Sequence, residues 1–293
     1  MHDFQYVVPT SLNEALKLLA RRGSAAQLLA GGTDLIVKMR VRRSRPELVV
    51  DAKHIPELNV FKLDGKGLTI GAAVPCRRIY LDERIAARYP ALVDCTTLVG
   101  GIQIQTRATV GGNLCNAAPS ADTIPALIAL GAVAEVRGAK NRRRIPVEEF
   151  CLGPGRTALK KGEMLIHLHI PKPARHSGAF FLRFIPRNEM DIAVVNAAAA
   201  VVLDANGKKF VSARIAVGAA APTPLYVEAA GASLAGKPVV EDTIIEAARI
   251  ASLAVRPITD MRGTIEQRRH LAGVLTARAI RGAVERAKVE KKK

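Results

Sequence analysis

The chain has 293 residues, 49% of them hydrophobic and 24% charged, a composition typical of a globular protein that can bury its own core. A net charge of +18 suggests a nucleic-acid partner, but the cations are scattered and aromatic residues make up only 4%, so stacking surfaces for bases are scarce. No apolar run approaches the roughly 20 residues that a membrane-spanning helix needs, and the N-terminal segment lacks the basic and apolar regions of a secretory signal.

The N-terminal segment, 1–57, predicts alternating strands and helices. Ser11 and Glu14 form a capping box, and leucine and alanine recur after it at helical spacing until Gly23. In chain order we expect a strand at 3–7, a helix between Ser11 and Gly23, a strand at 27–30, a short helix at 33–40 and a strand at 47–51.

The next segment, 58–175, begins with a hairpin, because alternating apolar residues flank the turn residues Asp64 and Gly65. Beyond the hairpin, Pro171 and Pro173 with the polar residues after them mark the best domain boundary. Helices are predicted at 82–88, 90–99 and 122–130, and strands at 132–137, 142–145 and 165–170.

The C-terminal segment, 176–287, has a different pattern, with strands first and helices after them. This order is typical of an α+β domain whose antiparallel sheet is covered on one face. We expect a three-stranded sheet from 180–185, 192–203 and 214–220, helices near 225–235, 242–255 and 264–286, and a basic tail at 288–293.

Two glycine pairs stand out as candidate binding segments. Gly31-Gly32 and Gly111-Gly112 are each flanked by a threonine, and backbone N–H groups in such segments can converge on an anion. We expect these glycines to let the backbone approach a ligand, although a single pair can also be a tight turn or bulge. Neither segment has the glycine spacing of a Rossmann fingerprint or a P-loop. Together they suit a pyrophosphate held between two loops.

Two carboxylates accompany these glycine pairs. Asp34 is awkward beside a phosphate because it is anionic, and it fits better as a cap of the following helix. Asp122 lies beyond the second pair, where a lone carboxylate can accept hydrogen bonds from ribose hydroxyls.

These segments resemble a known family. AGGTDL at 30–35 and TVGGNLCNAAPSAD at 109–122 are similar to the two flavin-binding signatures of the FAD subunit, or FAD domain, of the xanthine dehydrogenase family, which includes the medium subunits of aerobic carbon monoxide dehydrogenases. GRTALKKGEMLIHLHIP at 155–171 resembles the end of that FAD domain, and LRFIPRNEMDIAVVNAAAAV at 182–201 resembles the start of the C-terminal domain. The resemblance covers nearly the whole chain.

The resemblance implies an α+β fold with a vanillyl-alcohol-oxidase-type FAD domain of two subdomains, at about 1–57 and 58–175, followed by the C-terminal domain at 176–287. It implies FAD as the cofactor of this chain. By the match, Ile36 and Val37 extend the first signature, Met164 or Leu165 borders the cofactor, and Val99 replaces an aromatic residue of some relatives. The implied cofactor-binding residues are Ala30, Gly31, Gly32, Thr33, Asp34, Leu35, Ile36, Thr109, Val110, Gly111, Gly112, Asn113, Asn116, Asp122, Leu165 and Arg183.

The four cysteines are too far apart in the sequence for the C-x-x-C spacing of iron–sulfur or structural zinc sites. We therefore expect free thiols in the reducing cytoplasm and no metal cluster on this chain. The 4-hydroxybenzoyl-CoA reductase branch is disfavoured, because its iron–sulfur insertion is missing. The resemblance places the [2Fe-2S] clusters on a small partner subunit and the molybdenum-pterin cofactor on a large one, in a dimer of heterotrimers.

The implied function is electron transfer. The chain would pass electrons from the partner's clusters through FAD to NAD, a quinone or O2, with no catalytic acid, base or nucleophile of its own. His167 and His169 alternate on a predicted strand, where a half-exposed strand is favoured over a ligand pair. Two alternatives stay open, a stand-alone flavin reductase of the same fold and a basic nucleic-acid-binding protein.

Overall fold

Three short parallel strands form the N-terminal sheet of the computed structural model, which describes residues 2–187 and 190–289. The strand order is β1 (Gln5–Val7), β3 (Leu48–Asp51) and β2 (Ala26–Leu29). Helix α1 (Leu12–Arg22) begins where the capping box predicts, because Ser11 Oγ accepts a hydrogen bond from the Glu14 N–H. Its buried leucines pack on β3, and α2 (Leu35–Arg40) follows β2 after the first glycine pair.

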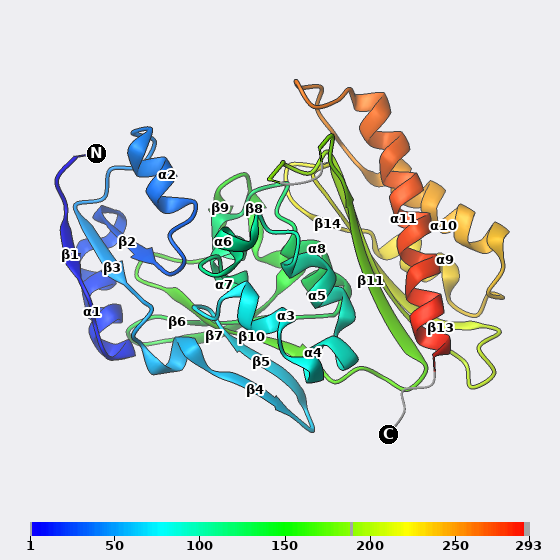
Figure 1. The fold of residues 1–293 in the computed structure, drawn as a ribbon, viewed down its shortest axis with the longest axis horizontal. Helices are drawn as coiled ribbons and strands as arrows, with labels where there is room; N and C mark the ends of the chain where they lie inside the picture. Colours follow the sequence, from blue (N-terminus) through cyan, green and yellow to red (C-terminus); the bar gives the residue numbers. More distant parts are fainter. Residues whose placement is uncertain (1, 188–189, 290–293) are drawn as a thin grey trace.

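A five-stranded antiparallel sheet forms the middle of the molecule (Figure 1). The predicted hairpin and the return of 142–145 onto 132–137 are both present. Strand β10 runs through the centre of the sheet and has an irregularity in register between Leu165 and His167. In spatial order the strands are β4 (Phe61–Asp64), β5 (Gly67–Gly71), β10 (Met164–Pro171), β6 (Val133–Arg137) and β7 (Arg142–Pro146).

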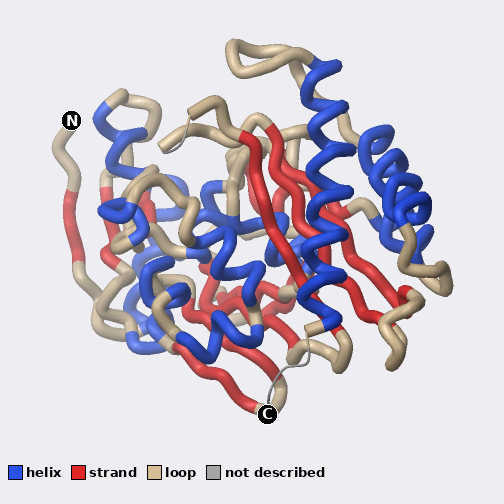
Figure 2. Tube along the Cα trace, turned by 45° about the vertical axis from the view of Figure 1, so that its right-hand side comes forward, coloured by secondary structure: helices blue, strands red, loops and turns tan. Residues whose placement is uncertain are grey.

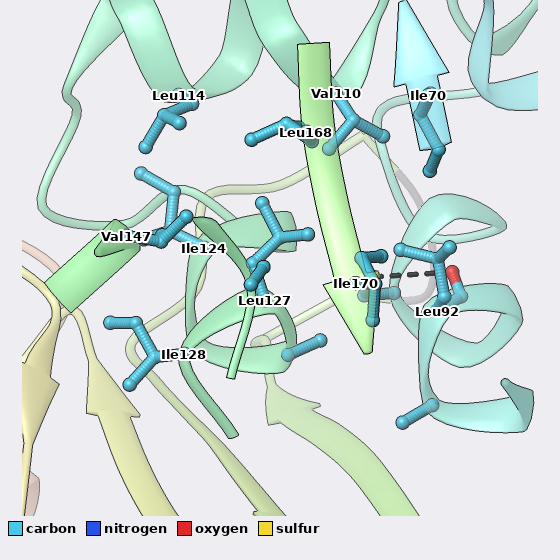
Figure 3. Packing of buried hydrophobic residues seen from close by; sticks show 14 of the residues in the cluster. Ile70, Leu92, Val110, Leu114, Ile124, Leu127, Ile128, Val147, Leu168 and Ile170 are labelled. Carbon is cyan, nitrogen blue, oxygen red and sulfur yellow. Dashed lines mark hydrogen bonds between the residues drawn. The ribbon is translucent and has the colours of Figure 1, made fainter. Parts of the chain in front are cut away.

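Short helices cover one face of this sheet. Figure 3 shows Val110 and Leu114 beside Ile124 and Leu127, close to Leu168 of β10. Several of these helices were not predicted, because elements of four to seven residues are too short to show a period. The segment contains α3 (Cys76–Tyr80), α4 (Glu83–Arg88), α5 (Pro90–Thr96), α6 (Ile102–Gln105), α7 (Val110–Asn116), α8 (Thr123–Ala129) and a small hairpin of β8 (Cys151–Gly153) and β9 (Arg156–Thr157).

The C-terminal sheet has four strands, so the expectation of three is wrong. The missed strand is the two-residue β14, which lies within the segment assigned to a helix and is too short to predict from alternation. Helices α9 and α11 pack on this sheet, and α10 packs against these two helices (Figures 1 and 2). The elements are β11 (Ser177–Phe184), β12 (Val195–Leu203), β13 (Phe210–Gly218), β14 (Leu225–Tyr226), α9 (Glu228–Leu234), α10 (Glu241–Ala254) and α11 (Ile265–Lys288).

The expected basic tail begins inside a helix, because α11 extends to Lys288, and residues 290–293 lie outside the described residues. Within 2–187 and 190–289, no helix is both long and apolar enough to cross a membrane.

An ion pair and a stacked ring join the C-terminal helix to the middle of the chain. Arg286 of α11 donates from Nη1 and Nη2 to the two carboxylate oxygens of Asp94 on α5, at 2.6 and 2.9 Å. The same guanidinium lies over the Phe180 ring of β11, 4.5 Å from its centre. Because a bidentate pair fixes both position and angle, it sets how α11 and β11 sit against α5.

The close packing of α11 on β11 generates a stability prediction. A Cβ at Gly178 would lie 2.1 Å from the Ala283 carbonyl oxygen and 2.5 Å from the Ala287 nitrogen. We expect Gly178→Ala to lower the free energy of unfolding by about 1–3 kcal/mol, because the helix must move away from the strand. Chemical denaturation measures this change. Gly65→Ala is the control, since a Cβ there has no heavy atom within 4 Å; equal stability of the two variants would contradict the prediction.

Candidate functional site

A cleft of about 720 Å³ opens between the N-terminal segment, with β2 and α2, and the five-stranded sheet with its helices. Its volume lies within the range of about 300–1,000 Å³ that is common for small-molecule and cofactor sites. Both glycine segments line it, in the region of α2 and α7 in Figure 1. The predicted site residues that line the cleft are Ala30, Gly31, Gly32, Thr33, Asp34, Leu35, Thr109, Gly111, Gly112, Asn113, Asn116 and Leu165.

The first glycine segment connects the end of β2 to the start of α2. The Ile36 N–H donates to the Gly32 carbonyl at 2.9 Å, so the helical hydrogen bonds begin within the motif itself. Asp34 occupies the N-cap position, as expected, but its side chain makes no capping hydrogen bond. Asp34 is exposed and lines the cleft.

The second glycine segment is the first turn of a helix, where a loop was expected. Thr109 is the N-cap of α7, and its Oγ1 accepts a hydrogen bond from the Gly112 N–H at 2.8 Å. The first-turn N–H groups of a helix have no partner within that helix, and they carry its positive dipole end. The Gly112 N–H is taken by the Thr109 cap, but Gly111 and Gly112 both line the cleft, so the positive end of α7 lies at the cleft wall, where it suits an anionic group.

Close contacts within the chain explain two of the four glycines. A Cβ at Gly31 would lie 2.1 Å from the Arg107 carbonyl oxygen, and one at Gly111 would lie 2.6 Å from the Cα of Ala72. Sequence analysis assigned all four glycines to the approach of a ligand. At Gly31 and Gly111, however, the atoms within reach belong to the protein backbone, so these glycines let the two sides of the cleft come together.

Polar contacts also connect the two sides of the cleft. Lys38 of α2 donates from Nζ to Asn116 Oδ1 of α7 at 2.5 Å. Asn113 Oδ1 accepts from the Thr123 hydroxyl at 2.6 Å, which directs that oxygen toward the start of α8. Lys160 and Lys161 line the same cleft, so its walls combine three ammonium groups with the N-terminal end of a helix.

Four of the predicted residues do not line the cleft. Val110 is fully buried in the core, and Ile36 on α2 is 41% exposed. Asp122 and Arg183 instead bind each other, with 2.5 Å between Asp122 Oδ2 and Arg183 Nη1. Burial raises the pKa of Asp122 to about 6, although the Arg183 guanidinium partly opposes this rise. Since Asp122 and Arg183 are 61 positions apart, the structure brings them together without placing either on the cleft wall.

Glu163 is a cleft residue that sequence analysis missed. Its carboxylate accepts hydrogen bonds from Arg143 Nη2 at 2.6 Å, from Asn141 at 2.7 Å and from the Lys160 N–H at 2.7 Å. Burial alone would raise the pKa of Glu163, but these hydrogen bonds outweigh burial and lower it to about 2. The sequence around Glu163 carries part of the family resemblance, but its side-chain partners Asn141 and Arg143 lie about 20 positions earlier in the chain and could not be inferred from spacing.

These features fit a dinucleotide with a diphosphate. The helix end and the lysines suit an anion, while Val99, Leu165 and Met164 supply apolar wall for a ring system. The close approach of backbone at Gly31 and Gly111 keeps the two walls at a fixed separation. FAD has both an anionic and an aromatic part, so the residues present fit it.

Comparison with known proteins agrees with this chemistry. Residues 2–173 match the family model for the FAD binding domain in molybdopterin dehydrogenase, and residues 180–283 match that for the CO dehydrogenase flavoprotein C-terminal domain. The chain is 35% identical over 287 residues to the carbon monoxide dehydrogenase medium chain of Afipia carboxidovorans, covering 98% of each. It is 33% identical over 290 residues to a xanthine dehydrogenase FAD-binding subunit of Escherichia coli, again covering 98% of each.

A solved structure shows the same fold. The chain matches a carbon monoxide dehydrogenase chain from Hydrogenophaga pseudoflava with a TM-score of 0.93 and 32% sequence identity, over 97% of this chain and 98% of the other. Taken with the two family models and the cleft, these matches show that the chain belongs to the FAD-binding subunits of the carbon monoxide and xanthine dehydrogenase family and is an oxidoreductase subunit with an FAD-binding domain.

Proposed function

We propose that this chain is the electron-transfer subunit of a molybdenum hydroxylase and holds FAD in the cleft between its two glycine segments. The observation that carries this proposal is the cleft itself, in which the first turn of α7 faces the loop that precedes α2. FAD supplies the redox chemistry, because a flavin exchanges one or two electrons. The protein binds the cofactor, orients it and sets its surroundings.

We assign the diphosphate of FAD to the space between the two glycine segments. The first-turn N–H groups of α7 other than the capped Gly112 N–H would donate to phosphate oxygens, and Thr33 lines the same cleft from the first glycine segment. Lys38 contributes a positive charge across the same gap, since it lines the cleft and already reaches Asn116. The Asp34 carboxylate suits a hydroxyl donor better than a phosphate, because like charges repel.

The direction of electron flow is part of the same proposal. Substrate would be oxidised at a molybdenum-pterin centre on a large partner, and electrons would pass through [2Fe-2S] clusters on a small partner to FAD and then to NAD, a quinone or O2. Relatives named as medium chain and FAD-binding subunit support a multi-subunit assembly. We further propose a dimer of such heterotrimers in the cytoplasm, where four free cysteines would remain reduced.

We propose the domain division at 1–175 and 176–287, with subdomains at about 1–57 and 58–175. Three hydrophobic clusters support it. One centres on Leu12, Leu16 and Val50, a second on the middle sheet and its helices, and a third on the C-terminal sheet with α10 and α11. Residues of β10 enter both of the first two clusters, which explains how the two subdomains remain in contact.

The stand-alone flavin reductase remains the competing function. It would require a substrate domain with its own proton donor beside the flavin. The match of residues 180–283 to the flavoprotein C-terminal domain favours the electron-transfer subunit instead.

Anaerobic flavin spectroscopy tests the function. We expect the purified chain to retain one FAD after gel filtration, and we expect that flavin to be bleached when oxidisable substrate is added to the complex with its co-purified partners. A chain that stays colourless after saturation with FAD would contradict the cofactor assignment. Flavin that is reduced only by NADH or NADPH, with the isolated chain as the active species, would favour the stand-alone reductase.

Gly112→Val tests the position of the diphosphate. The new Cβ would lie 2.8 Å from Thr109 Oγ1. Because Gly112 lines the cleft, the branched side chain would take up space in the cleft wall. We expect FAD affinity to fall at least tenfold, measured by fluorescence titration of the apoprotein. Gly65→Val is the matched control, because its Cβ position has open space around it. Stoichiometric flavin of unchanged affinity in Gly112→Val would remove this turn from the site.

Asp122→Ala tests the buried ion pair with Arg183, whose side chain is only 4% exposed. Removing one member of a buried pair leaves an uncompensated charge, so we expect the free energy of unfolding to fall by about 3–5 kcal/mol. If the pair also supports the cofactor, the free energy of FAD binding to the folded variant becomes less favourable by about 1–3 kcal/mol. Unchanged FAD affinity would remove Asp122 from the set of binding residues.

A surface pair provides the control for the stability measurement. Glu246 and Arg249 form an ion pair with side chains 52% and 58% exposed. Glu246→Ala should leave stability nearly unchanged, because solvent screens exposed pairs. If Asp122→Ala is as mild as Glu246→Ala in denaturant unfolding, the buried pair has no special role.

A further inference from the structure

Two histidines and a glutamate meet on one face of the middle sheet, and the function proposed above does not use them. His167 and His169 alternate along β10, and Glu135 lies opposite His167 on the neighbouring strand β6. Residues that alternate on a strand share one face, so all three side chains project to the same side of the sheet. The Leu168 side chain between the histidines points to the opposite face, into the core (Figure 3).

The donor atoms of this cluster lie close together. His169 Nε2 is 2.8 Å from Glu135 Oε2, and His167 Nδ1 is 3.6 Å from the same oxygen. One donor atom from each residue lies within 4.8 Å of the other two. Ligand atoms of a tetrahedral zinc ion are about 3.4 Å apart, given metal–ligand distances of about 2.0–2.1 Å. Small side-chain rotations would therefore bring the three donors to a common centre.

Outer hydrogen bonds already orient two of the three donors. The Thr69 hydroxyl of β5 lies 3.1 Å from His169 Nδ1, which leaves Nε2 of that ring directed at Glu135. Arg142 Nε forms an ion pair with Glu135 Oε1 at 2.9 Å, while the other oxygen, Oε2, lies by the histidines. Partners of this kind fix the tautomer and orientation of metal ligands in known sites.

His167 supplies an independent reason to look for a ligand. Neither of its ring nitrogens has a hydrogen-bond partner within the described part of the chain, although both are shielded from solvent. Buried polar atoms are normally paired, and one left without a partner requires an explanation. His169, with 30% of its side chain exposed, gives the cluster access to solvent.

We propose that Glu135, His167 and His169 form a binding site for a divalent transition-metal ion of the zinc class. Two imidazoles and a carboxylate are a donor set that zinc accepts, with a fourth position left for water. The site would fasten β10 to β6 on the sheet face opposite the Leu168 core. It lies apart from the cleft, whose lining includes none of the three residues.

Zinc titration of the holoprotein tests the site. The protein is prepared without a histidine tag, treated with a chelator and titrated with Zn²⁺ alone in a calorimeter, and bound metal is then measured after desalting. We expect one equivalent of zinc per chain. We expect the His167→Ala/His169→Ala double variant to bind at least 100-fold more weakly, with unchanged circular dichroism. Absence of a stoichiometric equivalent in the unaltered protein would overturn the proposal.

Two further variants locate the ion if the double variant does not fold. Thr69→Val removes only the outer partner of His169, and we expect zinc affinity to fall by about 10–100-fold. His270→Ala is the matched control, because this exposed histidine lies on α11, far along the chain from the cluster. Equal zinc affinity of Thr69→Val and His270→Ala would show that any bound zinc lies elsewhere and would overturn the assignment.

Discussion

The backbone contact between Gly31 and Arg107 is the constraint on which the site depends. No side chain larger than hydrogen fits there, because a Cβ would lie 2.1 Å from the Arg107 carbonyl oxygen. This contact brings the loop before α2 against the segment that leads into α7. Since Gly111 makes a similar contact with Ala72, the cleft is bounded by backbone in fixed positions, and the dinucleotide site follows from how closely these segments pack.

Strand β10 carries this arrangement to the rest of the FAD domain. Its irregular register near Leu165 lets Met164 and Ile166 enter the N-terminal core, while Leu168 and Ile170 enter the core beneath the helices. Leu165 also reaches the cleft wall. One strand therefore joins two hydrophobic clusters, borders the cofactor site and presents His167 and His169 on its outer face. A change in its register would move all of these side chains at once.

Charged groups hold the C-terminal domain against the middle of the chain. Arg286 meets Asp94 of α5, and Arg183 meets Asp122, which precedes α8. Arg214 similarly contacts the Ile128 carbonyl and Glu148. Part of the large excess of basic residues thus forms specific contacts between elements. Along the sequence, too, the basic residues are scattered rather than gathered in one run.

The sequence by itself determined the local features and the family. The Ser11 cap and the hairpin at Asp64 depend on neighbours a few residues away, so they can be deduced from spacing, and the two glycine motifs carry the resemblance to the family. The tertiary structure alone decided that Gly31 packs against Arg107, that Asp122 binds Arg183, that Glu163 gathers three donors and that β14 completes a four-stranded sheet. These contacts join segments far apart in the chain, and their partners are chosen by packing and burial, for which local sequence patterns carry no signal.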